Sequence, residues 1–226
     1  ECRMLFKNRK QAGQILGEKL HNYKNMNPLV LALPRGGVPV AAEIALALQA
    51  PLDVLIVRKI GAPFQPEVAL GAICENENPV WNEKFLSRLG IRSENLRTAV
   101  TREKNKIRQQ LALFRKGQPL PELDQKTVIL VDDGLATGAT MLAAVQFLKD
   151  KFAARIVIAV PVAATDAIAK IKGQVDDVVI QAERQDLISV GQWYEDFGQV
   201  SDDKVLSHLQ SSNSGTPSIE SRSVQI

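Results

Sequence analysis

The run TVILVDDGLATGATM, residues 127–141, contains the pattern from which the fold can be inferred. Its first five residues, Thr127–Val131, are apolar or β-branched and predict a buried strand. Two aspartates, Asp132 and Asp133 (the acid pair), follow at once, and a loop rich in glycine and threonine then leads into an apolar helix. A strand, a loop and a helix in this order form one unit of an α/β protein, whose ligands bind where the parallel strands end.

The loop after the acid pair has the composition of an anion site. Gly134 and Gly138 allow a tight turn and a close approach of the backbone. Thr137 and Thr140 add hydroxyl donors, and the backbone N–H groups at the start of the following helix attract phosphate. The acid pair would repel a phosphate, so it must face hydrogen-bond donors such as sugar hydroxyls, or a hydrated Mg2+. The loop therefore indicates a ligand like ribose 5-phosphate.

Two common nucleotide motifs are absent from the chain. No GxGxxG fingerprint and no GKS or GKT sequence occurs, which argues against a dinucleotide fold and a P-loop. A purely structural interpretation also remains, in which the acid pair caps the helix and the glycines only turn the chain. Two adjacent acids at the end of a buried strand are costly without a ligand, so we favour the binding site.

Apolar runs and helical patterns alternate along the rest of the chain. We expect strands at 29–33, 52–57, 69–73, 127–131, 155–160 and 177–180, a loop at 58–67, and helices at 9–23, 38–48, 82–89, 94–115, 139–151, 165–172 and 201–209. This alternation predicts an α/β fold with an open, mainly parallel twisted sheet and helices on both faces. Residues 1–210 are expected to form a single domain, and the polar residues 211–226 a disordered tail.

The composition excludes several other classes of protein. The 226 residues carry a formal net charge of +3, with 45% apolar and 23% charged residues, as in ordinary globular domains. Two histidines and two cysteines are too few for a histidine-rich metal cluster or a disulfide scaffold. No apolar run is long enough for a membrane span, and the first residues lack the apolar core of a signal peptide. We therefore expect a cytoplasmic protein without membrane contact.

Three segments resemble a known family. VDDGLATGAT at 131–140 resembles the signature loop of the type I phosphoribosyltransferases. LPRGGVP at 33–39 resembles that family's pyrophosphate loop, and VRK at 57–59 resembles the start of its flexible loop. The similarity is greatest to a set of unassigned phosphoribosyltransferases that carry LPRGG, VRKIGAP, VDDGLATG and GQWY-DF segments, and it extends to about residue 209.

The resemblance implies a core at about 29–180 and a small hood built from about 1–27, 60–90 and 181–210. It implies a ribose and 5-phosphate site at Asp132, Asp133, Gly134, Ala136, Thr137, Gly138, Ala139 and Thr140. It further implies a pyrophosphate site at Arg35, Gly36 and Gly37, with Mg2+ near Asp132 and Asp133, in part through water. Family members often form dimers, so a homodimer is a further expectation.

Catalytic groups are expected at Arg58, Lys59 and Glu67. The two basic residues follow a strand, where positive charge would stabilise the departing pyrophosphate. In hypoxanthine-guanine enzymes an aspartate occupies the position of Ala136 and exchanges a proton with the purine, which alanine cannot do. Glu67 is our candidate for that role, because a closing loop would bring it over the base; an ordinary exposed glutamate is the alternative.

The acceptor site is expected in the hood, at Val190, Trp193 and Asp196. The surrounding segment GQWYEDF, residues 191–197, is rich in aromatics in a chain that is only 5% aromatic. An aromatic side chain there would stack on a flat base, or it would only pack the hood; both interpretations remain open.

The resemblance implies a transferase that moves a 5-phosphoribosyl group from phosphoribosyl pyrophosphate (PRPP) to a small aromatic, nucleobase-like acceptor, with release of pyrophosphate. One alternative is a regulatory protein that senses a phosphoribosyl ligand and binds nucleic acid through the basic helix at 91–116. We consider a solvated helix the better interpretation, because no aromatics interleave with its charges. A sugar-phosphate hydrolase with a nucleophilic aspartate is the third alternative.

Overall fold

A five-stranded parallel sheet forms the centre of the molecule. The computed structural model describes residues 5–62 and 65–213, without the side chains of 65–67 and 213. The strand order is β2-β1-β6-β7-β8, and every neighbouring pair is parallel. These strands are β1 (Pro28–Ala32), β2 (Leu52–Val54), β6 (Thr127–Val131), β7 (Arg155–Ala164) and β8 (Asp177–Arg184). The predicted α/β fold with a parallel sheet is confirmed.

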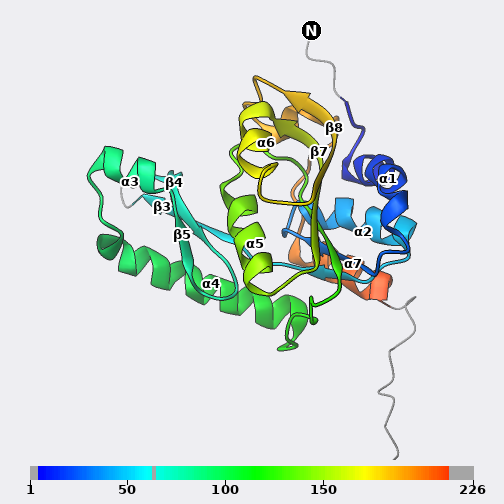
Figure 1. Cartoon of the computed structure of the whole chain (residues 1–226), viewed down its shortest axis with the longest axis horizontal. Coiled ribbons are helices and arrows are strands. Elements are labelled where there is room, and N and C mark those ends of the chain that lie inside the picture. The colour runs from blue at the N-terminus through cyan, green and yellow to red at the C-terminus, as the bar shows by residue number, and fades with distance from the viewer. Residues whose placement is uncertain (1–4, 63–64, 214–226) are drawn as a thin grey trace, which may run out of the picture.

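Helices cover both faces of this sheet (Figure 1). One face carries α1 (Arg9–Lys19), α2 (Gly37–Leu48) and α7 (Asp202–Asn213). The other carries α5 (Ala139–Asp150) and α6 (Thr165–Ile171). Each connection from one parallel strand to the next runs through a helix or a longer excursion, as parallel pairing requires.

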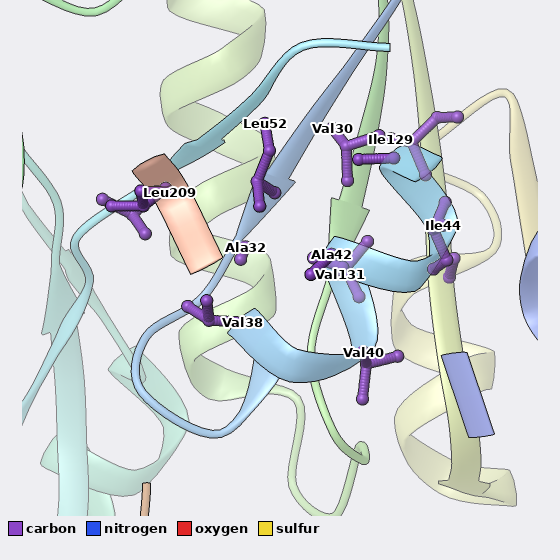
Figure 2. Packing of buried hydrophobic residues seen from close by; sticks show 14 of the residues in the cluster. Val30, Ala32, Val38, Val40, Ala42, Ile44, Leu52, Ile129, Val131 and Leu209 are labelled. Atoms are coloured by element: carbon purple, nitrogen blue, oxygen red, sulfur yellow. The ribbon is translucent and has the colours of Figure 1, made fainter. Parts of the chain in front are cut away.

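The core follows from the alternation of side chains along the strands. Val30 of β1 and Ile129 of β6 point toward α2, where they meet Ile44 (Figure 2). The intervening residues, including Leu31 and Leu130, belong to the second core beneath α5. Both faces are apolar, so the strands are continuous hydrophobic runs, and each fully buried Leu, Ile or Val contributes about 1.5–3 kcal/mol.

A second, smaller sheet lies beside the first (Figure 1). Its three antiparallel strands, in the order β3-β4-β5, are β3 (Arg58–Ala62), β4 (Gln65–Ile73) and β5 (Pro79–Trp81). With it go α3 (Glu83–Leu89), the 3-10 turn η2 (Ser93–Leu96) and the long α4 (Arg97–Arg115). Leu70, Leu86 and Leu96 form its separate core.

The expected loop at 58–67 is wrong, because the chain forms β3 and the start of β4 there. Gly61, Pro63 and Pro66 suggested an irregular segment. The pairing of β3 with β4 shifts register on either side of Gly61, and such a bulge accommodates glycine within a strand. The strand expected at 69–73 is therefore only the second half of β4, which begins at Gln65. β5 was not predicted from the sequence.

Several boundaries also differ from expectation. β7 and β8 continue past residues 160 and 180 because their later residues pair with each other, from Val162 with Ala182 to Ala164 with Arg184. β2 ends earlier, at Val54. α7 runs to Asn213, so residues 211–213 are helical; residues 214–226 of the expected tail lie outside the described residues.

The first described residues pair with the segment that follows β8, near the carboxyl ends of the central strands. Leu5 and Phe6 donate backbone hydrogen bonds to the carbonyl of Trp193, in η3 (Val190–Trp193), at 3.1 and 3.0 Å. The segments that we assigned to a hood thus lie in two places. The N-terminal residues and those after β8 pair with each other, and residues 60–90 form most of the small sheet and α3. None of the helices within the described ranges combines the length and the apolarity needed to cross a membrane.

Candidate functional site

The acid pair and the LPRGG segment occupy the switch point of the central sheet. β1 has β2 on one side and β6 on the other, so the connections after β1 and β6 diverge and leave a crevice. The acid pair follows β6, and Gly36 and Gly37 follow β1. A Cβ on Gly36 would lie 2.1 Å from Asp133 Oδ2, and one on Gly37 would lie 2.7 Å from the Val131 carbonyl oxygen. Only glycine permits this approach, so the two segments form one site.

Each carboxyl of the acid pair has one oxygen that is bound by the protein and one that is not. Asp132 Oδ1 accepts the backbone N–H of Asp133 at 2.8 Å, and Asp133 Oδ2 accepts Arg9 Nε at 2.8 Å. The two carboxyls and the Asp133 N–H also interact within the pair. Among the described residues no donor from outside the pair reaches Asp132 Oδ2 or Asp133 Oδ1, and neither atom is sealed from solvent. Two carboxyl oxygens are therefore left to a ligand.

Burial dominates the electrostatics of the acid pair. It raises the pKa of Asp132 well above the ordinary carboxyl range, and the neighbouring Asp133 raises it further. Burial also raises the pKa of Asp133, while the charge of Arg9 opposes this shift. On Asp132, the positive charges of Lys59 and Arg9 both act to lower the pKa, against the effect of burial. A ligand that donates hydrogen bonds to the acid pair would relieve the cost of these charges.

The glycine-threonine loop is anchored at its middle. Leu135, which is buried, donates to the Val162 carbonyl at 2.9 Å and accepts from the Ala164 N–H at 2.8 Å, so it pairs with the end of β7. The N–H groups of residues 136–138 meet no acceptor among the described residues, and the first turn of α5 leaves its own N–H groups free. These donors can bind an anion.

Two glycines give this loop its shape. Gly138, which precedes α5, has a φ of +80°, in the left-handed region that favours glycine. A Cβ on Gly134 would lie 2.4 Å from Val190 Cγ1, so the loop packs closely against η3. Thr137 is exposed, whereas Ala136, Ala139 and Thr140 are half-buried.

Lys59 of β3 is exposed, and its positive charge acts on Asp132 from a distance, with no ion pair between the two among the described residues. Arg58, on the same strand, pairs instead with the buried Glu103 of α4, at 3.1 Å. Arg35 is exposed and lies 3.7 Å from Asp202 of α7. The side chain of Glu67 lies outside the described residues. The predicted basic groups thus do not converge in this form of the protein.

The three expected acceptor residues have different environments. Val190 contacts the loop at Gly134. Trp193 is half-buried, its ring is covered by the guanidinium of Arg184 at 4.6 Å, and its Nε1 is buried without a hydrogen-bond partner in the described part of the chain. Asp196 is exposed and caps the Gly198 N–H at 3.1 Å.

Sequence reasoning missed the residues that support Asp133. Tyr194, buried between the rings of Phe6 and Phe197, donates its hydroxyl to the Asp133 carbonyl oxygen at 2.6 Å. Arg9 reaches the Asp133 carboxyl from α1. The aromatic run at 191–197 was a signal for Tyr194, but nothing in the sequence distinguishes Arg9 from other helical arginines.

The acid pair fits Mg2+ in the chemistry of its donors. Carboxylate oxygens are ligands that Mg2+ prefers, and this ion is commonly held by one or two carboxylates, several waters and substrate phosphates. Within residues 5–62 and 65–213, no group of three or more His, Cys, Asp or Glu side chains forms a complete protein site. A metal here would have to bind together with a phosphate ligand.

The basic helix α4 is largely neutralised by ion pairs. Lys106 and Arg102 contact Glu103, at 2.9 and 3.1 Å, alongside Arg58. Arg108 makes a two-pronged contact with Glu77, at 2.6 and 2.8 Å. This pairing is typical of a structural surface and gives no specific support to nucleic-acid binding.

Comparison with curated proteins identifies relatives that match nearly the whole length of this chain. Two Mycobacterium tuberculosis proteins, from strains CDC 1551 and H37Rv, are 40% identical over 205 residues and are named putative phosphoribosyl transferases. The match covers 91% of this chain and 46% of those proteins, so the chain spans about half the length of these relatives.

Solved structures extend the comparison. The crystal structure of TT1426 from Thermus thermophilus is 39% identical, with a TM-score of 0.78 over 92% of this chain and 99% of that chain. A hypothetical protein from Neisseria gonorrhoeae with bound ppGpp, 14% identical, has a TM-score of 0.51 over 92% and 96% of the two chains and shows the fold alone. The family model of the phosphoribosyl transferase domain matches residues 3–192. With its acid pair and anion loop at the switch point of the sheet, the chain belongs to the phosphoribosyl transferase family.

Proposed function

We propose that the protein transfers a 5-phosphoribosyl group from PRPP to a nucleobase-like acceptor, with Mg2+ and with release of pyrophosphate. The observation that carries this proposal is the acid pair, whose two unbound oxygens lie beside a loop of free backbone N–H groups. The oxygens match the 2- and 3-hydroxyls of a ribose, and the loop matches its 5-phosphate.

The remaining residues suit a reaction that proceeds by charge stabilisation. Displacement at C1 of the ribose through a cation-like sugar needs little covalent help, so positioning and electrostatics dominate. The backbone of Gly36 and Gly37 approaches the acid pair closely enough to bind pyrophosphate next to the ribose. The positive charge of Lys59 acts on Asp132 from a distance. Mg2+, when bound with the acid pair and the phosphates, supplies charge that stabilises the departing pyrophosphate.

Isothermal titration with PRPP and Mg2+ tests the ligand. We expect binding to the wild type and its loss in the double variant Asp132→Asn with Asp133→Asn. A matched control is Glu122→Gln with Asp124→Asn, which removes the same charge from an exposed loop before β6, and should bind PRPP normally. Absence of binding to the wild type, or unchanged binding in the acid-pair variant, would reject the proposal.

A screen of nucleobases and small aromatic amides with labelled PRPP tests the reaction. We expect one acceptor class to give a labelled nucleotide together with an equal amount of pyrophosphate. Binding of PRPP without pyrophosphate release for any acceptor would favour the ligand-sensing alternative. Light scattering with and without PRPP would test the proposed homodimer.

A further inference from the structure

Arg9 is bound at three points around the acid pair. Its Nε donates to Asp133 Oδ2 at 2.8 Å, and its NH1 donates to the Gly198 carbonyl oxygen at 2.8 Å. Its guanidinium carbon lies 3.8 Å from the centre of the Phe197 ring. Only 11% of the Arg9 side chain and 15% of the Asp133 side chain are exposed. These contacts hold the guanidinium in one orientation, and a charge-assisted hydrogen bond is strong where water is largely excluded.

Asp133 is held on its other sides as well. The hydroxyl of Tyr194 fixes its carbonyl oxygen, and the backbone of Gly36 lies directly against its carboxyl. Because Arg9 binds Oδ2, the carboxyl cannot rotate without breaking an ion pair. Oδ1 is thereby the oxygen that is presented to a ligand.

Within the described residues, Arg9 is the charged side chain in direct contact with the Asp133 carboxyl. The other ionisable groups around it are Asp132 on the same strand end, Lys59 of β3, whose charge acts on Asp132, and the Tyr194 phenol. Removal of Arg9 would take the donor from Asp133 Oδ2 and leave the carboxyl free to turn.

We propose that Arg9 is a positioning residue for the phosphoribosyl ligand, which holds the Asp133 carboxyl turned so that Oδ1 accepts a ribose hydroxyl. This inference rests on the proposed function and extends it from the strand ends to α1. Arg9 itself need not touch the substrate.

The test compares Arg9→Met, Arg9→Lys and the control Lys10→Met by titration with PRPP and Mg2+ at one neutral pH. Lys10 is exposed on the same helix, so its variant removes a charge without contact to the site. Arg9→Met should weaken binding about 10- to 100-fold. Arg9→Lys keeps a charged donor, so we expect it to restore part of the affinity that Arg9→Met loses.

The outcomes separate this inference from the proposed function. If wild-type protein fails to bind PRPP, the proposed function fails and this inference falls with it. If the wild type binds, and Arg9→Met keeps the wild-type affinity, only the inference is overturned. Tighter binding by Arg9→Met would also overturn it, because Arg9 would then compete with the ribose. Should Arg9→Met fail to fold, as judged by circular dichroism, unchanged affinity in Arg9→Lys relative to Lys10→Met would contradict the proposed geometry.

Discussion

Two clusters in the molecule have nearly the same composition, a pair of buried carboxyls with one arginine. The first is the acid pair with Arg9. The second consists of Asp53, Glu75 and Arg115 and lies between β2, the end of β4 and the end of α4. In both clusters burial raises the pKa of the carboxyls and the arginine opposes the shift. Residue type and burial therefore do not distinguish them.

The difference lies in how far the protein satisfies the carboxyls. Arg115 donates to both oxygens of Glu75, at 2.9 and 2.5 Å, to Asp53 at 3.2 Å and to the Val54 carbonyl at 2.6 Å. Glu75 also accepts the Ile56 N–H at 2.9 Å. Asp53 takes both of its hydrogen bonds, from Arg115 and the Val54 N–H, at Oδ1. In the acid pair, by contrast, each carboxyl has a single donor at hydrogen-bonding geometry among the described residues, and neither has both oxygens bound as Glu75 has. Glu75 with Arg115 is therefore a satisfied structural pair, and the acid pair is the more open to a ligand.

The largest effect that this comparison predicts is the loss of stability caused by Arg115→Met. The substitution leaves Asp53 and Glu75 buried without a counter-charge, which costs about 3–5 kcal/mol of unfolding free energy. Urea denaturation measures it, with Arg88→Met as the control, because Arg88 is an exposed helical arginine whose loss should cost at most about 0.5 kcal/mol. Equal costs for the two variants would show that the Arg115 cluster does not stabilise the fold.

Single substitutions that remove one charge should separate the clusters by function. Asp132→Asn converts a free carboxylate oxygen into an amide and should weaken PRPP binding about 10- to 100-fold. Glu75→Gln should leave the affinity within about twofold and lower stability instead. Titration calorimetry measures the PRPP affinity of both variants, and urea denaturation measures their stability. Loss of binding in Glu75→Gln together with normal binding in Asp132→Asn would contradict the assignment of the two clusters.

Gly36→Ala tests the close approach between the two strand ends. The added methyl would lie 2.1 Å from Asp133 Oδ2, so the carboxyl must move, and we expect about a tenfold loss of PRPP affinity. The matched control is Gly173→Ala, whose Cβ would have no neighbour within 4 Å. Wild-type affinity in Gly36→Ala would mean that the orientation of Asp133 is not critical.

The smallest effect concerns the pH dependence of stability. The pKa of Asp132 is raised in the folded state, so the folded protein binds more protons there than the unfolded chain, and stability falls as the pH rises through that range. Asp132→Asn removes this dependence. The difference in unfolding free energy between variant and wild type, measured in urea without ligand, should therefore grow as the pH rises from 4 to 8. A flat difference would show that the acid pair is not strained.

The parts of the molecule that sequence predicted well are those determined by local pattern. The strand at 127–131 and the helix after the glycine-threonine loop follow from a short apolar run and helical periodicity, and both were found. β3 was missed because glycine and proline suggested a loop where a bulge accommodates Gly61. This error also affected the site. Arg58 and Lys59 were grouped as one basic site, but neighbouring residues in a strand point to opposite faces. Arg58 pairs with Glu103, whereas Lys59 is exposed.

The supporting residues could not have been found in this way. Arg9 and Asp133 are 124 residues apart in the chain, and Tyr194 and Asp133 are 61 apart. Such contacts depend on the tertiary fold, in which α1 and the segment after η3 meet at the end of β6. Only the structure shows which arginine belongs to which carboxyl.

The pairing of residues 5–7 with 193–196 has a consequence for biosynthesis. The segment that carries Arg9 leaves the ribosome before its partners Phe197 and Gly198, which are translated almost two hundred residues later. At about 5–20 residues per second, the nascent polypeptide spends on the order of 10–40 s without a finished substrate pocket. Ligand thus cannot assist the early stages of co-translational folding, and the strained carboxyls are assembled only when most of the apolar interior already exists.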